Sequence, residues 1–206
     1  YASGLRRLGH EVTVYSQAYW TRNYLRHKVD PLRITWAEEP HDVTVLRQLD
    51  HAAPADILVA SAWQTAAPVH AWVGRTGGHG LYFIQHHESL WTGGQDAADT
   101  YRLPLAKVVI STWLKEIMKD EYDQDSTLLV TPVDDILFEC QSDRPDRARR
   151  VLLLHHTFDW KGVDDGMRAF EAARGQHPDL QLVVLGGLEE DPPLPDGAEY
   201  HFQPDR

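Results

Sequence analysis

The sequence has a single cysteine, Cys140, and no apolar run long enough to cross a membrane as a helix. One cysteine excludes an internal disulfide framework and is compatible with a reducing compartment, so we expect a cytoplasmic protein. Basic residues are few, since Lys+Arg 20 stand against Asp+Glu 31 and the formal net charge is -11. Such a balance argues against non-specific binding to nucleic acid or to anionic lipid. Without a membrane-spanning run, peripheral contact is the membrane contact left open.

Three common nucleotide and hydrolase motifs are also missing. No Gly-x-Gly-x-x-Gly joins a predicted strand to a predicted helix, which argues against a nicotinamide dehydrogenase. There is no Walker loop, and there is no Gly-x-Ser-x-Gly elbow of the kind that carries a nucleophilic serine.

The chain does contain strands that alternate with helices. With 42% hydrophobic and 10% aromatic residues in 206, it can bury a core. Apolar or alternating runs predict strands, at residues 11–15, 55–60, 81–85, 107–110, 127–130, 151–154, 180–185 and 198–202. The runs at 55–60 and 151–154 are continuous, which predicts strands buried in a parallel sheet. The alternation as a whole predicts an α/β fold with two doubly wound parallel sheets.

A polar stretch at residues 141–150 separates two such groups of elements. We therefore predict an amino-terminal domain over 1–138 and a second domain over 139–206. Residues 16–54 are less legible, with short strands or irregular structure at 29–36 and 43–46. The chain opens without methionine, inside a predicted helix that leads into a strand, so we expect a fragment whose first strand is missing.

Lys161 and Gly162 lie in the loop of a predicted βαβ unit. Val163, Met167 and Phe170 follow at i, i+4 and i+7, which places them on one helix face. The loop therefore joins a strand's carboxyl end to a helix's amino end, where free N–H groups and the helix dipole favour anions. The alternative is that Lys161 is a solvated charge, or that it pairs with acidic residues in the helix's first turn.

Polar and aromatic residues follow several predicted strands: Trp63 after one, His86, His87 and Glu88 after another, and His155 and His156 before Lys161. Parallel α/β sheets bind ligands at this carboxyl edge. We predict no metal site, because adjacent histidines on a strand point to opposite faces and no His-Glu-x-x-His or Cys-x-x-Cys spacing occurs.

Three residues after the predicted strands, His86, Trp63 and Trp91, each admit a functional and a structural interpretation. His86, beside Glu88, is placed to act as a catalytic or substrate-orienting group, or else it satisfies backbone groups nearby. Trp63 and Trp91 are flat rings that suit the apolar face of a sugar, but with seven tryptophans in the chain, ordinary packing accounts for either of them.

Several stretches, taken together and in order, resemble the family-4 retaining glycosyltransferases of the GT-B fold. These are residues 5–14 (LRRLGHEVTV), 108–115 (VVISTWLK), Pro132-Val133-Asp134 with Phe138, 159–164 (DWKGVD) and 178–187 (PDLQLVVLGG). Within that family, residues 82–88 and 100–105 look most like enzymes that add rhamnose or related sugars to bacterial surface polysaccharides.

The resemblance implies two Rossmann-like domains, a nucleotide-sugar donor with no cofactor, and a glycan or lipid-linked acceptor on the amino-terminal domain. It implies transfer with retention of configuration and no required metal. The implied roles are catalytic for His86 and Lys161; donor-binding for Lys161, Gly162, His156 and Gly186; and acceptor-binding for Trp63, His87 and Glu88. His86 falls near the position of the family's acceptor-side histidine, and His87 or Gln85 could occupy that position instead.

The sequence departs from the family at three places. His155 and His156 stand where the family has an arginine, the glycine-rich loop after the first strand is absent, and the family's donor-binding carboxylate pair would lie beyond Arg206. A histidine is only partly charged near neutral pH, so it offers less to a diphosphate than an arginine. We therefore expect this chain alone to have little or no transferase activity. A non-catalytic sugar- or nucleotide-binding module on the same fold is the alternative.

Overall fold

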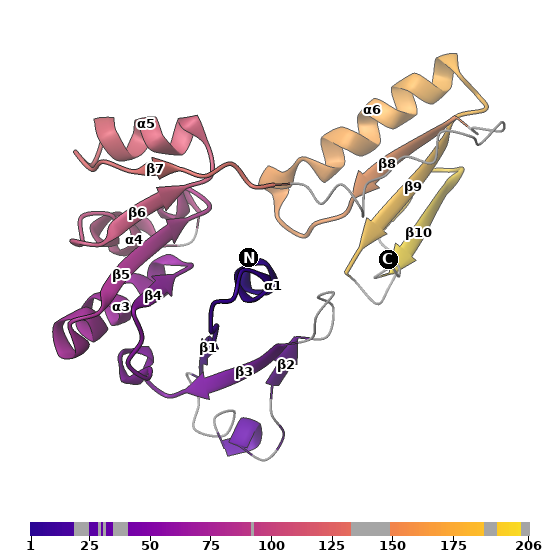
Figure 1. Ribbon diagram of the computed structural model, residues 1–206. Helices are drawn as coiled ribbons and strands as arrows, with labels where there is room; N and C mark the ends of the chain where they lie inside the picture. The colour runs from indigo at the N-terminus through magenta and orange to yellow at the C-terminus, as the bar shows by residue number, and fades with distance from the viewer. Residues whose placement is uncertain are drawn as a thin grey trace. The chain divides into compact units, whose positions relative to one another are not determined.

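The computed structural model describes residues 1–18, 25–28, 30, 32–34, 41–91, 93–132, 149–187 and 193–202. The chain divides into two compact units, Tyr1–Val133 and Asp134–Arg206 (Figure 1). The predicted domain boundary, between residues 138 and 139, lies within 133–148 and so outside the described residues. No helix among the described residues has the length and apolar character needed to span a membrane.

The first unit contains a four-stranded parallel sheet in the order β4-β5-β6-β7. Its strands are β4 (Ile57–Ala60), β5 (His79–Ile84), β6 (Ala106–Val109) and β7 (Thr127–Leu128). Helices α3 (Trp63–Thr76), α4 (Gly94–Thr100) and α5 (Thr112–Asp120) lie in the connections between them. The predicted parallel α/β arrangement is confirmed for this part of the chain.

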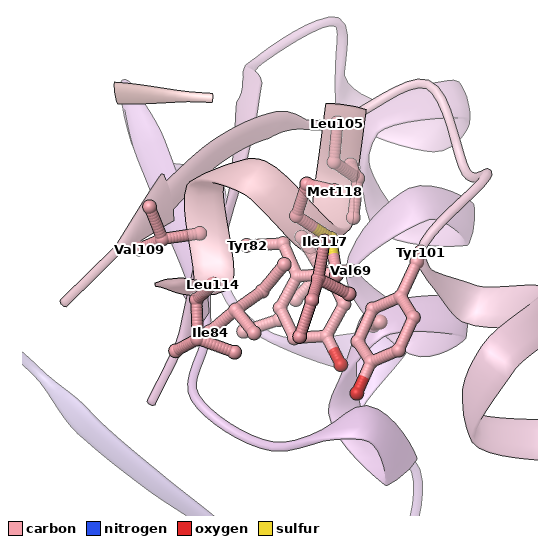
Figure 2. Close-up of a cluster of buried hydrophobic side chains, with 11 residues drawn as sticks. Val69, Tyr82, Ile84, Tyr101, Leu105, Val109, Leu114, Ile117 and Met118 are labelled. Carbon is pink, nitrogen blue, oxygen red and sulfur yellow. The ribbon is translucent and has the colours of Figure 1, made fainter. Parts of the chain in front are cut away.

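Helices α3 and α5 supply side chains to the core on one face of this sheet. Tyr82, Ile84 and Val109 are fully buried on the strands and pack with residues of both helices (Figure 2). Helix α5 begins where it does because the Ser111 side chain accepts a hydrogen bond from the N–H of Leu114. Helix α3 ends at Gly77, whose φ of 74° is the left-handed conformation that glycine adopts at no steric cost.

The amino-terminal residues form a smaller mixed sheet in the order β1-β3-β2. Helix α1 (Ala2–Arg7) leads to β1 (Val14–Gln17), which pairs parallel with β3 (His41–Leu46), and β2 (Leu32–Ile34) pairs antiparallel with β3. The two ranges left open by the sequence therefore both contain strands. The short helix η1 (Leu49–His51) follows β3 and packs against α3.

The second unit contains a parallel sheet in the order β10-β9-β8. Its strands are β8 (Arg150–Leu154), β9 (Gln181–Gly186) and β10 (Ala198–Phe202), and helix α6 (Val163–Gln176) joins β8 to β9. Val163 and Phe170 are buried and Met167 packs against the core, so the predicted apolar face of this helix is confirmed. This core also contains Leu182 and Val184.

Both continuous apolar strands were predicted to be buried, and this is wrong for the edge strands β4 and β8. Ile57 and Val59 are 57% and 49% exposed, and Leu152 and Leu154 are 62% and 69% exposed. Each strand pairs with one neighbour only among the described residues. Every second side chain therefore lies on the sheet face that the connecting helix does not cover.

Candidate functional site at the strand ends

The residues that follow β5 have different environments, and the side chain of His87 lies in the core. Its side chain is 4% exposed and lies beside the rings of Tyr101, Trp113 and Tyr122, at centroid distances of 6.0, 6.0 and 6.1 Å. Its Nε2 is 3.2 Å from the Tyr122 hydroxyl. The acceptor-binding role of His87 stays a prediction, and this burial favours a packing role.

Glu88 connects the end of β5 to the start of helix α3. Its Oε2 accepts hydrogen bonds from the Trp63 backbone N–H at 2.9 Å and from the Tyr82 hydroxyl at 3.2 Å, and its own N–H donates to the Tyr101 hydroxyl at 2.8 Å. Burial raises the pKa of the Glu88 carboxyl, and the hydrogen bonds from Tyr82 and Trp63 oppose that rise. Burial also raises the pKa of Tyr101 to about 12. A carboxylate at this helix end is favoured by the helix dipole and ties the loop after β5 to α3.

His86 lies against Trp91 instead of the core. The two rings are nearly parallel, with 8° between their planes and 6.0 Å between their centroids. His86 is half-buried, whereas Trp91 is 45% exposed. Gln85, the alternative acceptor-side residue, is exposed, and its Nε2 lies 3.5 Å from the Ser61 carbonyl oxygen.

Trp63 has a different environment from Trp91. It is half-buried, and a Cβ placed on Gly93 would come within 2.9 Å of Trp63 Cε2 and 3.0 Å of Nε1. The Nε1 atom is covered, with no hydrogen-bond partner among the described residues. Trp63 therefore packs against Gly93, and its predicted contact with an acceptor remains a prediction.

In the second unit, aromatic rings surround the predicted Lys161–Gly162 loop. Phe158 and Trp160 stack at 5.7 Å, and the His156 ring lies 4.7 Å from that of Phe158. The Lys161 Nζ lies 4.2 Å above the Trp160 ring, in cation–π geometry. Phe158 and Trp160 are 50% and 39% exposed.

Lys161 forms no ion pair within the described part of the chain; instead, Asp165 in the first turn of α6 pairs with Arg168. The predicted alternative, a Lys161 pair with acidic residues of that turn, is therefore not what the structure contains. Gly162 is the N-cap of α6 with a φ of 70°, so the loop enters the helix through a left-handed residue. Lys161 itself directly precedes this N-cap, and its ammonium group lies over the Trp160 ring.

Gly186 ends β9 close to side chains of its own unit. A Cβ there would lie 2.5 Å from the Tyr200 hydroxyl and 3.0 Å from His155 Cβ. The close packing alone requires glycine, so a donor-binding role for Gly186 stays a prediction. Among the described residues, no three histidine, cysteine, aspartate or glutamate side chains are grouped so as to hold a metal ion.

No model of a known protein family matches the chain, and a search of curated proteins finds none similar to it. The family named by the sequence motifs therefore remains a resemblance, and a functional assignment rests on these motifs and on the geometry of the strand ends.

Sequence reasoning missed Phe158, Trp160, Tyr101 and Tyr122 as neighbours of the predicted residues. Phe158 and Trp160 precede Lys161 by three and one positions in the printed sequence, and this aromatic spacing was the available signal. No local signal indicated that Tyr101 and Tyr122 would enclose His87, because those contacts join residues 14 or more positions apart.

Proposed function

We propose that this protein is a retaining glycosyltransferase that moves a sugar from a nucleotide-sugar donor to a glycan or lipid-linked acceptor. The proposed pathway class is surface polysaccharide synthesis, and the proposed fold is GT-B. The observation that carries the proposal is the Lys161 ammonium at the start of α6, held over Trp160 and without an acidic partner among the described residues.

The donor diphosphate is the ligand that this loop suits best. When the sugar leaves, negative charge grows on the terminal phosphate, and a cation placed there lowers the barrier by stabilising charge that is larger in the transition state than in the ground state. Lys161 supplies that charge, and the free N–H groups at the start of α6 supply hydrogen bonds. Gly162 allows the backbone to approach the ligand without a Cβ.

His156 contributes to the same ligand in a defined way. The Phe158 N–H donates to His156 Nδ1 at 3.1 Å, so Nδ1 is unprotonated and the ring donates through Nε2 only. In this tautomer the ring offers one N–H, at Nε2, to a phosphate oxygen. This is a weaker contribution than the two parallel hydrogen bonds and fixed charge of an arginine.

The acceptor side of the proposal is assigned to the first unit. His86 is the acceptor-side catalytic residue in the proposal, because it lies at the carboxyl end of β5 with its ring outside the core. The Nε2 atom of His86 is covered, so in the proposal Nδ1 makes the hydrogen bond that orients the acceptor hydroxyl.

Isothermal titration of the chain with UDP, GDP, ADP and dTDP tests the donor side without requiring turnover. At least one nucleoside diphosphate should bind, and Lys161→Ala should weaken binding by about tenfold or more, since a charge-assisted hydrogen bond contributes about 1.5–3 kcal/mol. Lys115→Ala, which removes an exposed lysine of α5, is the matched control. Failure of all four to bind, or equal affinity for Lys161→Ala, would remove the donor site from the proposal.

A radiolabelled transfer assay separates the enzyme from the binding module. The replacement of the family's arginine by His155 and His156 favours the second candidate, a nucleotide-binding module without catalysis. Nucleotide binding with no transfer would support that candidate.

A further inference from the structure

We propose that Trp160 is a positioning residue, which holds the Lys161 ammonium group in place for the donor diphosphate. The inference rests on the proposed function, in which Lys161 meets that diphosphate. Trp160 is assigned no contact with the ligand, so its effect on binding passes through Lys161 alone.

Lys161 is an exposed lysine whose ammonium group contacts a ring instead of a carboxylate. Its Nζ lies 4.2 Å from the centroid of the Trp160 ring, which is 39% exposed. In the described part of the chain no carboxylate pairs with Lys161, and Asp165 in the first turn of α6 pairs with Arg168. An exposed lysine side chain otherwise samples many rotamers, and ordering it costs conformational entropy. The cation–π contact therefore restricts a group that would otherwise be mobile.

The Trp160 ring is itself held by its neighbours in the loop. It stacks on Phe158 at a centroid distance of 5.7 Å with 17° between the ring planes, and the His156 ring lies 4.7 Å from that of Phe158. The backbone forms the short helix η3 (Asp159–Lys161), and the Lys161 N–H donates to the Phe158 carbonyl oxygen at 2.9 Å. The ring and the ammonium group therefore belong to adjacent residues of one hydrogen-bonded turn.

A cation that is ordered before the ligand arrives binds an anion more tightly than a mobile one. The entropy of ordering the lysine side chain is already lost, so it does not reduce the affinity. The fixed position also matters when charge grows on the leaving phosphate, because a preorganised group stabilises that charge without moving. An ammonium group has three N–H donors, and a single ring face engages one side of it. The remaining donors can bind phosphate oxygens while the ring contact persists.

Two other interpretations of the contact predict different effects on binding. If the ammonium group had to leave the Trp160 ring to reach the diphosphate, the ring would compete with the ligand and its removal would strengthen binding. If the exposed indole stacked on the nucleobase, its removal would weaken binding even in a chain without Lys161. In the positioning role, removal of the ring weakens binding only where Lys161 is present.

An NMR experiment on methylated lysines tests the contact without any ligand. The chain has five lysines, and reductive methylation with isotope-labelled formaldehyde converts each to a dimethylated amine that keeps its positive charge. The Lys161 signal is the one that Lys161→Arg removes. Its methyl protons should lie upfield of those of the exposed Lys115 because of the indole ring current, and Trp160→Leu should abolish this shift. Phe202→Leu, which removes a 43% exposed ring of β10, is the control and should leave the shift unchanged.

A double-mutant cycle measured by isothermal titration tests the consequence for binding. With a nucleoside diphosphate that binds the unmodified chain, Trp160→Leu should weaken the affinity about two- to fivefold, as expected for one exposed cation–π contact. In a Lys161→Ala background the same substitution should have no further effect. Trp160→Phe should keep most of the affinity because a ring remains. Circular dichroism of each variant should match that of the parent chain.

Three results would overturn the positioning role of Trp160. An unshifted Lys161 signal in the parent would show that the contact does not form. An affinity of Trp160→Leu equal to or higher than that of the parent would show that the ring is neutral or competes with the ligand. An undiminished effect of Trp160→Leu in the Lys161→Ala background would show that the indole touches the ligand directly.

These failures are distinguishable from failure of the proposed function. If nucleoside diphosphates bind in a Lys161-dependent way while Trp160→Leu changes nothing, the donor site stands and only the role of Trp160 falls. If no nucleoside diphosphate binds, the donor site falls and the role of Trp160 falls with it, even where a shifted Lys161 signal shows that the contact itself forms.

Discussion

Substitutions of Glu88 separate two opposing effects of its carboxyl group on stability. The hydrogen bonds that it accepts stabilise the fold, and the burial of its negative charge destabilises it. Glu88→Gln keeps an oxygen for the Trp63 N–H and a polar group for the Tyr82 hydroxyl, but it removes the negative charge. Glu88→Ala removes the charge and both hydrogen bonds. The glutamine and alanine variants are both neutral, so their difference isolates the hydrogen bonds and the side-chain packing.

The expected difference between the two variants follows from the hydrogen bonds that alanine loses. Each hydrogen bond contributes about 1 kcal/mol net, and a donor left buried without a partner costs about 1–3 kcal/mol. Water reaches this half-buried site, so the lower end of that range applies. Glu88→Ala should therefore unfold with a free energy about 2 kcal/mol below that of Glu88→Gln, at any pH.

The comparison of Glu88→Gln with the parent chain isolates the charge. Burial raises the pKa of Glu88 in the folded state, so the folded chain holds this proton more tightly than the unfolded chain. The resulting stabilisation is fully present below the unfolded pKa, about 4.3, and is lost as the pH rises through the folded pKa. The parent should match Glu88→Gln at acid pH and become less stable than it as the pH increases towards neutrality.

Urea unfolding between pH 4 and pH 7.5, followed by tryptophan fluorescence, measures these differences. Six of the seven tryptophans belong to the first unit, so the signal reports the unit that contains Glu88. With a slope of about 2 kcal/mol/M, the alanine variant's midpoint should lie about 1 M below that of the glutamine variant. Glu116→Gln, on the exposed side of α5, is the control and should follow the parent at every pH. Equal midpoints for the alanine and glutamine variants, or a parent that gains stability over Glu88→Gln with rising pH, would refute this reasoning.

Two further substitutions test how the first unit is built. Ser111→Ala should lower the free energy of unfolding by about 1 kcal/mol, because it removes the acceptor for the Leu114 N–H, and Ser111→Asp should restore most of that loss. Equal thermal unfolding of the parent and the two variants would contradict the capping assignment. Gly80→Ala should cost about 1–3 kcal/mol, since the added Cβ would lie 2.5 Å from Leu105 Cδ2. Gly74→Ala, in the open interior of α3 with nothing within 4 Å of its Cβ, should instead stabilise the chain by about 0.5–1 kcal/mol, and similar urea midpoints for the two alanine variants would show that Gly80 is not closely packed.

Local sequence features were sufficient to predict most of the elements. The apolar run at 151–154 lies in β8. The i, i+4, i+7 spacing of Val163, Met167 and Phe170 correctly predicted the face of α6 that packs on the sheet. The side chain of Ser111 accepts the first-turn N–H of Leu114 and so caps α5. These properties depend on residues within one helical turn or one strand, so the local sequence contains them.

Burial could not be predicted in the same way. The apolar runs of β4 and β8 indicated strands, but Val59 and Leu152 are 49% and 62% exposed. An apolar run indicates a strand, but whether both of its faces are buried depends on other segments of the chain that pack against them. The pairing in the mixed β1-β3-β2 sheet was missed for a related reason, because β1 and β3 join residues 29 positions apart and such pairing leaves little trace in either strand alone.

The candidate site shows the same division between local and long-range information. The sequence by itself determined that His86, His87 and Trp91 follow a strand of a parallel sheet, and that Lys161 precedes a helix, because strand and helix periodicity are local. Only the tertiary structure decided that His87 is enclosed by Tyr101 and Tyr122 while His86 stacks on an exposed Trp91. Neighbouring side chains on an extended backbone point in opposite directions, and which one enters the core depends on rings that other elements bring to it.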